Sequence, residues 1–188
     1  DPNTSFVSMG VYIFNTETLV KNVIADAKNK NSSHDFGKDI VPRMIESNKV
    51  VVHSFKEPGP EGGRYWRDIG TLDAYWAANI DLCSANPQCN LYDETWPIRT
   101  YQIQAPPAKI VQVTARGKSA TRKSQIVNSV ISGGCLISGA EIKNSVLSHN
   151  VIVESGASLD EVVALDRVRI GQGARIKKAI IDQDVDIP

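Results

Sequence analysis

The sequence lacks an excess of either charge, because 21 Lys and Arg residues balance 21 Asp and Glu residues over 188 positions. A nucleic-acid or membrane-surface partner needs a basic face, so this balance argues against both. No apolar run approaches the roughly 18 residues of a membrane-spanning helix. The hydrophobic content of 41% is typical of a globular protein, and we expect neither a membrane nor a nucleic acid as partner.

Cysteine is also scarce. The three cysteines, Cys83, Cys89 and Cys135, are odd in number and form no C-x-x-C pair. They fit a reduced, cytoplasmic compartment better than a disulfide framework or a zinc site. Cys135, within "SGGCLI", is predicted to be a small core residue and not a reactive thiol. The sequence does not start with Met and opens in a strand-like segment, so we expect a piece of a longer protein.

The first half mixes strand-like and helix-like segments, which predicts an α/β fold. The pattern predicts a buried strand over 6–15, which is rich in β-branched and aromatic residues, and a second strand over 49–57, where the residues alternate as in a strand. Helices are expected over 16–30, with Thr16 as N-cap, over a short segment at 40–48, and over 72–86. Thr71 is the expected cap of the last helix, and Asp73 lies in its first turn, where the helix dipole favours an anion.

The second half has a different period. From Ile126 onward an aliphatic residue recurs every five or six positions, with slippage near Val163 and Leu165, and small or turn-forming residues lie between. This spacing is typical of a hexapeptide β-helix, in which each short strand forms one side of a triangular coil. An irregular β-sandwich is the alternative. "QAPPAK" indicates a stiff linker, and the expected parts are an α/β domain over 1–104, a linker over 105–125 and a β-helix over 126–188.

Asp68 is the first candidate for chemistry, because it lies in "YWRDIGTLDAYWAAN" directly before a predicted helix. Loop carboxylates most often cap helices or stay solvated. Here Thr71 already occupies the better capping position, which leaves Asp68 available for another task. A carboxylate before a helix N-terminus suits a site that holds Mg²⁺ and a phosphate together. We expect the neighbouring aromatic residues to restrict water and stiffen the loop.

Several motifs together resemble one enzyme family, the bacterial glucose-1-phosphate adenylyltransferases. They are "FVSMGVYIF", "SSHDFGKDIVP", "YWRDIGTLDAYWAAN", "YDETWPIRTY", "PPAK" and "SGGCLISG", in this order along the chain. The resemblance implies the end of a nucleotidyltransferase domain followed by a left-handed β-helix. It also implies formation of ADP-glucose and pyrophosphate from ATP and α-glucose 1-phosphate with Mg²⁺, toward glycogen or starch.

The resemblance assigns site residues by motif. Ser8, in "SMG", is expected to contact glucose 1-phosphate, and Asp68, in "WRDIGT", is expected to hold Mg²⁺ as a catalytic residue. His34 and Asp35 either line the sugar site or cap the next helix. The family's Gly-rich nucleotide loop and its F-x-E-K-P lysine segment are not found in this sequence, so we expect an incomplete catalyst.

Other signals are rejected or left without residues. "RGKSATRK" contains Gly-Lys-Ser, but Gln112 stands where a phosphate-binding loop needs its first Gly, and the basic residues are expected to be a solvated loop. The family implies an anionic allosteric effector, for which the sequence assigns no residues. A hexapeptide acyltransferase is an alternative whose only β-helix histidine is His149, and a non-catalytic regulatory subunit of the same family is another.

The sides of the predicted β-helix bear on assembly. Outward residues such as Val127, Val130, Val146 and Val163 have no evident cover within the chain. Two-fold pairing of such faces would bury them. The family resemblance also implies a homotetramer, so the β-helix is expected to carry much of the subunit contact.

Overall fold

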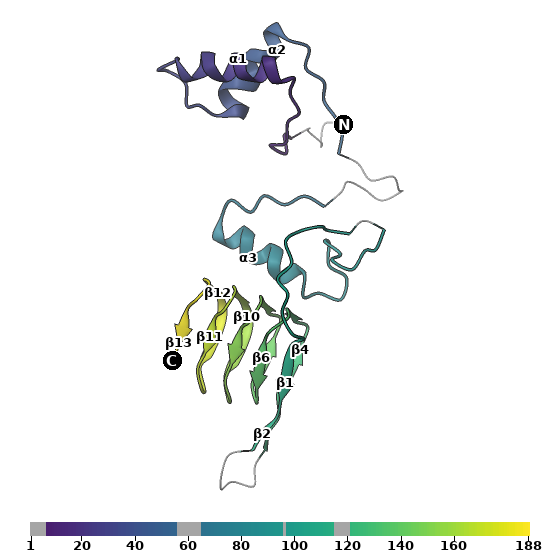
Figure 1. Cartoon of the computed structure of the whole chain (residues 1–188), viewed down its shortest axis with the longest axis vertical. Coiled ribbons are helices and arrows are strands. Elements are labelled where there is room, and N and C mark those ends of the chain that lie inside the picture. The colour runs from purple at the N-terminus through teal and green to yellow at the C-terminus, as the bar shows by residue number, and fades with distance from the viewer. Residues whose placement is uncertain (1–6, 56–64, 96, 115–120) are drawn as a thin grey trace, which may run out of the picture. The chain divides into compact units, whose positions relative to one another are not determined.

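The computed structural model describes residues 7–55, 65–95, 97–114 and 121–188 (Figure 1). Contacts within the chain divide it into two units, residues 1–66 and 67–188. Within the described ranges, no helix is both long enough and apolar enough to cross a membrane.

The described part of the first unit is helical. Its elements are α1 (Thr16–Ala27), the π-helical turn η1 (Phe36–Ile40) and α2 (Val41–Ser47). The N-cap of α1 is Asn15, whose Oδ1 accepts hydrogen bonds from the amides of Glu17 and Thr18. The prediction of Thr16 as cap was wrong by one residue, because Asn15 keeps the extended backbone of a cap whereas Thr16 is already helical.

The two strands predicted in this unit are not formed over the residues described, 7–15 and 49–55. Their apolar side chains are exposed instead: Ile13 fully, and Val51 by 76%. A strand needs a hydrogen-bonded partner, and neither segment pairs with another strand in the described ranges. The prediction of strands over these two segments was therefore wrong for the residues described.

The second unit begins with helix α3 (Leu72–Asp81). Thr71 caps it as predicted, because its Oγ1 accepts a hydrogen bond from the amide of Ala74, and Asp73 lies in the first turn. The helix ends five residues earlier than the expected boundary at 86. From Leu82 the amides bond three residues back, as Cys83 does to the carbonyl of Ile80, so the chain tightens into turns.

Most strands of this unit form a parallel β-helix with three faces, which confirms the predicted solenoid. Face A carries β1, β6, β9, β11 and β13; face B carries β4, β7 and the first halves of β10 and β12; face C carries β5, β8 and the second halves of β10 and β12. The bounds are β1 Lys109–Val111, β4 Gln125–Val127, β5 Val130–Ile131, β6 Leu136–Ser138, β7 Glu141–Lys143, β8 Val146–Leu147, β9 Ile152–Val153, β10 Ser158–Ala164, β11 Arg169–Ile170, β12 Arg175–Ile181 and β13 Asp186–Ile187.

The periodic aliphatic residues point inward, as the spacing predicted. In the middle coils the large residues of this series are fully buried: Ile137, Ile142, Leu147, Val153, Leu159 and Ile170. The slippage near Val163 has a simple cause. Ala164 fills the inward position, in register with Leu147 and Ile181 on the neighbouring coils. Val163 therefore points outward from face C.

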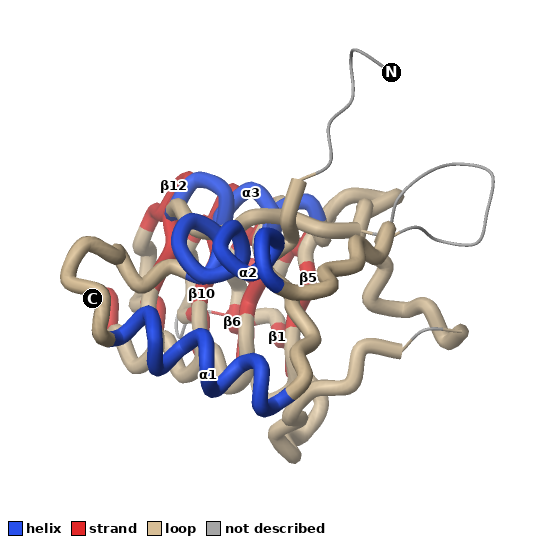
Figure 2. The backbone as a smooth tube through the Cα atoms, turned by 90° about the horizontal axis from the view of Figure 1, so that it is seen from above, coloured by secondary structure: helices blue, strands red, loops and turns tan. Residues whose placement is uncertain are grey.

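Face C is covered by the chain itself, which corrects the expectation that its valines lack cover. Val146 and Val163 are 8% and 1% exposed although both point away from the core. Helix α3 lies next to β10 (Figures 1 and 2), and the indole nitrogen of Trp76 donates to the carbonyl of Glu161 at 2.9 Å. Val127, on face B, is 46% exposed and fits the original expectation.

The solenoid starts earlier than the sequence suggested. Strand β1 lies within the segment 105–125 assigned to a linker, yet Lys109 to Val111 pair in parallel with β6. The first coil then departs from the repeat to form the antiparallel pair β2 (Val113–Thr114) and β3 (Thr121–Arg122). Because of this extra length, the first coil was not recognised in the sequence. The apolar period is recognisable only where consecutive coils are equally long.

Candidate functional site

Asp68 lies on a short loop that leads into α3. Its Oδ1 accepts a hydrogen bond from the amide of Gly70 at 2.9 Å, and Thr71 then caps the helix. Capping of α3 therefore does not use Asp68, as the sequence predicted. The expectation that aromatic residues keep water from this carboxylate is wrong for the described residues, since Asp68 is exposed and Trp66 is 44% exposed.

Asp68 is the one side chain of this loop that the sequence assigned to a metal. Among the described residues, no group of three or more His, Cys, Asp or Glu side chains is placed to hold a metal ion. This donor set fits Mg²⁺ bound by one or two carboxylates together with substrate phosphates, and it does not fit an all-protein cage. Asp68 is therefore compatible with a shared magnesium site.

Ser8 is joined to an aromatic cluster in the first unit. Its hydroxyl lies 2.9 Å from that of Tyr12, and it also accepts the amide of Gly10 at 3.2 Å. The ring of Tyr12 stacks near Phe36, with centroids 6.2 Å apart, and Phe14 lies 5.9 Å from Phe36. The structure thus connects Ser8, through Tyr12, with the first residue of η1, although the two are far apart in the sequence.

Tyr12 and Phe36 were not selected from the sequence. Both lie inside recognised motifs, Tyr12 four residues after Ser8 and Phe36 directly after Asp35. The missed signal was their position. The phenol of Tyr12 lies near Ser8 in one motif, and the ring of Phe36 follows Asp35 in the other. Such rings can pack on the apolar face of a sugar while the polar groups bind its hydroxyls and phosphate.

The loop with His34 and Asp35 is held by two different contacts. Asp35 caps η1, because its Oδ1 accepts the amide of Lys38 at 2.8 Å, so the capping role considered for it is real. His34 has φ 59°, a left-handed conformation that is costly for a residue with a Cβ, and its Nδ1 lies 2.9 Å from Oδ2 of Asp26. The role of either residue in binding sugar stays a prediction.

Asp26 is the residue that fixes this loop, and it was not selected from the sequence. It is the buried charged side chain of the described residues, at 2% exposure. Its carboxylate accepts the hydroxyl of Ser32 at 2.8 Å and pairs with His34 and with the guanidinium of Arg43. The hydrogen bond from His34 lowers the pKa of Asp26, with smaller contributions from Ser32 and Arg43, against the opposing effect of burial.

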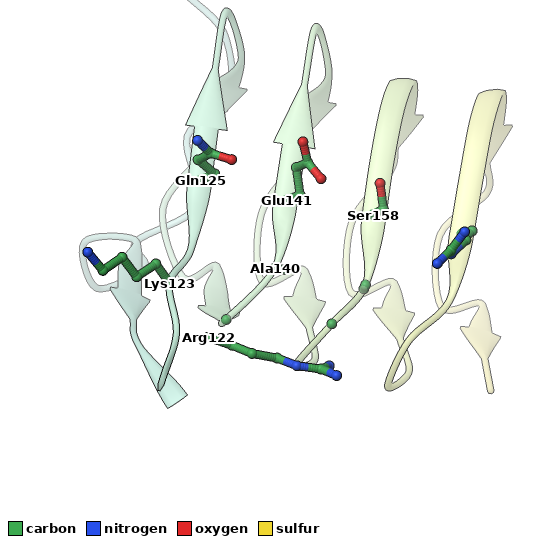
Figure 3. A pocket seen from close by; sticks show the side chains of 10 residues that line it. Arg122, Lys123, Gln125, Ala140, Glu141 and Ser158 are labelled. Carbon is green, nitrogen blue, oxygen red and sulfur yellow. The ribbon is translucent and has the colours of Figure 1, made fainter. Parts of the chain in front are cut away.

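A groove of about 450 Å³ lies on face B of the β-helix (Figure 3). Gln125, Glu141, Ser158 and Arg175 stand in register along it, one from each coil. Arg122 crosses the corner beside Gly156, where its guanidinium occupies the space that a Cβ would need. Lys123 points away from the row in Figure 3. The groove mixes charges, because the carboxylate of Glu141 lies among the basic side chains of Arg122 and Arg175. We assign no catalytic role to it.

Two earlier candidates can be placed. His149 lies at a corner of the β-helix, where its amide donates to Oδ1 of Asp166, and it does not line the groove. The Gly-Lys-Ser sequence at 117–119 lies outside the described residues. Cys135 is confirmed as a core residue: it is 1% exposed, its Sγ donates to the carbonyl of Ser148, and burial raises its pKa.

Comparison with known proteins also finds two parts in the chain, and it includes α3 in the first part. Residues 1–85 match the family of nucleotidyl transferases, and residues 106–188 match the GlmU-like C-terminal hexapeptide family. Proteins named glucose-1-phosphate adenylyltransferase match both parts at once. Those of Paramagnetospirillum magneticum and Koribacter versatilis are 46% and 45% identical over 100% of the chain. The chain is a relative of the glucose-1-phosphate adenylyltransferases.

These adenylyltransferases match the chain over its whole length, but the chain spans only part of each of them. The chain spans 43% of the Paramagnetospirillum protein and 44% of the Koribacter protein. A third adenylyltransferase, from Methylococcus capsulatus, is 45% identical over 100% of the chain and is spanned to 43%. The nucleotidyl transferase match confirms the predicted nucleotidyltransferase part before the β-helix.

Proposed function

We propose that this chain forms part of the catalytic site, and the β-helix, of an enzyme that makes ADP-glucose and pyrophosphate from ATP and α-glucose 1-phosphate, in glycogen biosynthesis. One observation carries the proposal. Adenylyltransferases match the chain over its whole length, through a nucleotidyl transferase part and a hexapeptide part in the same order.

The sugar phosphate is assigned to the first unit. The hydroxyl of Ser8, held beside that of Tyr12, would bind glucose 1-phosphate, and the ring of Phe36 offers a surface for the sugar. The loop with His34 and Asp35 would line the same site, because Phe36 follows it directly. The fixed position of this loop, which depends on Asp26, supports the assignment, since binding costs less when the site is already ordered.

The chemistry is a displacement at phosphorus. A phosphate oxygen of glucose 1-phosphate forms a bond to the α-phosphorus of ATP, and the bond from that phosphorus to the bridging oxygen of pyrophosphate breaks. The attacking oxygen is already ionised at neutral pH, so no protein base is needed. Mg²⁺ would neutralise charge on the phosphates, and Asp68 would contribute one of its ligands. The groups that bind the ATP base would come from sequence outside this chain.

Assembly and regulation belong to the same proposal. Exposed Leu136 and Ile152 stand in register on face A, which supports pairing of β-helices into a homotetramer. The groove with Arg122 and Arg175 has the charge to receive an anionic effector. Three free cysteines support a cytoplasmic location. Light scattering on the isolated chain tests the assembly, since a clean monomer of 20.5 kDa would contradict contact through the β-helix.

A fusion protein tests the activity. We would join the chain to the N-terminal part of the Koribacter relative and measure ADP-glucose and pyrophosphate formed from ATP and glucose 1-phosphate. The fusion should be active, and the chain alone should form no product. Asp68→Asn in the fusion should lower kcat by about 10²-fold or more, because a charged ligand of the metal is lost.

The neighbouring carboxylate gives the control for that substitution. Asp73→Asn removes a charge of the same sign five residues away, on the first turn of α3, and should leave kcat within a factor of about 2. Near-normal turnover in Asp68→Asn, with unchanged Mg²⁺ dependence, would remove Asp68 from the catalytic site. Product formation by the chain alone would contradict the proposal that it holds only part of a site.

A further inference from the structure

Helix α3 connects Asp68 to the β-helix within a single unit of the structure. Two side-chain hydrogen bonds follow one another before and at its start: Asp68 accepts the amide of Gly70 in the loop, and Thr71, the cap, accepts the amide of Ala74. Because these bonds are consecutive, the position of the carboxylate depends on where the first turn of α3 lies. Whatever fixes α3 therefore also fixes Asp68.

Trp76 makes the directional contact between α3 and the β-helix. Its indole N–H donates to the carbonyl of Glu161 at 2.9 Å, and the ammonium nitrogen of Lys178 lies 5.0 Å from the centroid of its ring. The ring is half-buried between them. A cation over an indole face is attracted by the π electrons, so the two contacts hold the ring from different sides.

The shape of the coil explains why a carbonyl is available at this point. Glu161 and Lys178 stand at equivalent corners of adjacent coils, both in the left-handed conformation, with φ 57° and 48°. The parallel pairing of β10 with β12 joins Asp160 to Lys177 and Val162 to Ala179, and it passes over the corner residues. At this corner the carbonyl of Glu161 accepts the indole N–H of Trp76.

Packing alone would not fix α3 in the same way. The valines of face C set how close the helix lies, but apolar contacts are not directional and allow the helix to turn about its axis. A hydrogen bond from a rigid indole to a backbone carbonyl is directional, so it sets this rotation. The rotation decides where the first turn presents Asp68.

We propose that Trp76 is a positioning residue for the reaction: by anchoring α3 to the Glu161 corner, it holds Asp68 in place for the metal. This rests on the proposed role of Asp68. It also makes the corner of β10 and β12 a route by which a change in the β-helix alters the catalytic site, because Glu161 and Lys178 both belong to the solenoid.

The decisive variant is Trp76→Phe, which keeps an aromatic ring but removes the N–H donor. In the fusion protein we expect kcat to fall about 10-fold and the Mg²⁺ concentration for half-maximal rate to rise about 5-fold, with the KM for glucose 1-phosphate unchanged. Misplacement of a catalytic group by about 1 Å is enough for losses of this size or larger. Tyr75→Phe, one residue earlier on α3, is the matched control and should change neither quantity.

Hydrogen exchange on the 188-residue chain gives a readout that does not depend on activity. In Trp76→Phe the amides of Gly70 and Ala74 should exchange about 5-fold faster, while those of the inner coils keep their protection. Lys178→Met, which removes the cation but leaves the indole bond, should shift exchange and Mg²⁺ requirement in the same direction by a smaller factor. This second variant keeps the test decisive if Trp76→Phe folds poorly.

The outcomes separate this inference from the proposed function. If Asp68→Asn is inactive while Trp76→Phe and Lys178→Met match the unsubstituted fusion in rate, Mg²⁺ requirement and exchange, the anchoring role is overturned and the proposed function stands. If Asp68→Asn keeps full activity, the role of Asp68 and the inference fail together. Faster exchange throughout the β-helix would show that Trp76 stabilises the fold generally, and it would also overturn the positioning role.

Discussion

The hydroxyl of Ser8 lies 2.9 Å from the hydroxyl of Tyr12, within one turn-like segment that starts the described chain. Either hydroxyl can donate, so the pair can present one donor and one acceptor to a ligand. The amide of Gly10 bonds to Ser8 as well, and the φ of Gly10 is 71°, a conformation that glycine adopts readily. The Ser8 hydroxyl is therefore oriented before any ligand binds.

Ser8→Ala in the fusion protein should act on sugar-phosphate binding. Loss of one hydrogen bond to a charged phosphate corresponds to about 1.5–3 kcal/mol, which is a rise of roughly 10- to 100-fold in the KM for glucose 1-phosphate. The KM for ATP and the kcat should change much less. Tyr12→Phe is the companion variant, with a smaller expected rise in KM, because it leaves the Ser8 hydroxyl in place. Initial-rate kinetics with each substrate varied would distinguish these effects, and an unchanged KM for the sugar phosphate in Ser8→Ala would contradict the assignment.

Asp26→Asn should change how stability depends on pH. The pKa of Asp26 is lowered in the folded chain, first by the hydrogen bond from His34, so the unfolded form takes up a proton at higher pH than the folded form does. The contribution of the Asp26 carboxylate to the free energy of unfolding is therefore complete above its ordinary pKa of 3.8. It is lost as the pH falls from there through the lower pKa of the folded chain. Urea unfolding should show Asp26→Asn less stable than the unsubstituted chain at pH 7, with the difference narrowing below about pH 4.

An exposed ion pair provides the comparison for Asp26. Asp184 pairs with Arg167, and both side chains are exposed, at 57% and 47%. Exposed pairs contribute little to stability because water screens them. Asp184→Asn should therefore shift the urea midpoint at pH 7 much less than Asp26→Asn. Equal shifts in the two variants would mean that the buried carboxylate does not hold the loop.

Gly139→Ala should destabilise the β-helix more than Gly173→Ala. Both glycines occupy corners with positive φ, 57° and 77°, so both substitutions carry the backbone cost of about 1 kcal/mol. At Gly139 a Cβ would also lie 3.2 Å from the carbonyl oxygen and the Cβ of Arg122, whereas at Gly173 nothing lies within 4 Å. We expect about 1 kcal/mol more destabilisation in Gly139→Ala, measured by equilibrium urea unfolding. Identical losses would indicate that β3 moves freely away from the corner.

The three cysteines should differ in reactivity. Cys83 and Cys135 are buried, and burial raises the pKa of both thiols, so little thiolate forms at pH 8. Cys89 is half-buried. A thiol reagent at pH 8 should label one cysteine quickly, and the other two only after unfolding in urea. Cys89→Ser should abolish the fast phase; fast labelling that persists in this variant would show that the core opens.

The repeat was predictable because a solenoid is built from local relations. Each inward residue, such as Ile142 or Leu159, contacts mainly the equivalent residue one coil away, so the spacing in the sequence is the spacing in the core. The Thr71 cap was predictable for the same reason, since its bond to Ala74 spans three residues. A pattern of this kind can be recognised from the sequence alone, because the residues that form the contact are close together in it.

Features that depend on distant partners were not predictable. The segments around Ile13 and Val51 have the composition of strands, but a strand forms only with a partner, and the composition of one segment does not reveal whether its partner is present. Asp26 resembled any polar residue on a helix, because its three side-chain partners lie 6 to 17 residues later. Trp76 was recognised as aromatic, yet its acceptor, Glu161, lies 85 residues away.

The β-helix is a triangular column with three sides, and helix α3 of the same chain covers one of them. With face C occupied by α3, a second subunit can approach only along face A, along face B, or at an end. Face B carries a mixed row of charged and polar side chains, while face A carries an apolar pair between charged neighbours, Arg169 among them. An assembly that buries an apolar side would then use face A, which carries this pair and is not covered by α3. Neighbouring subunits would contact each other through face A, and each α3 would lie on a different side of its subunit from this contact.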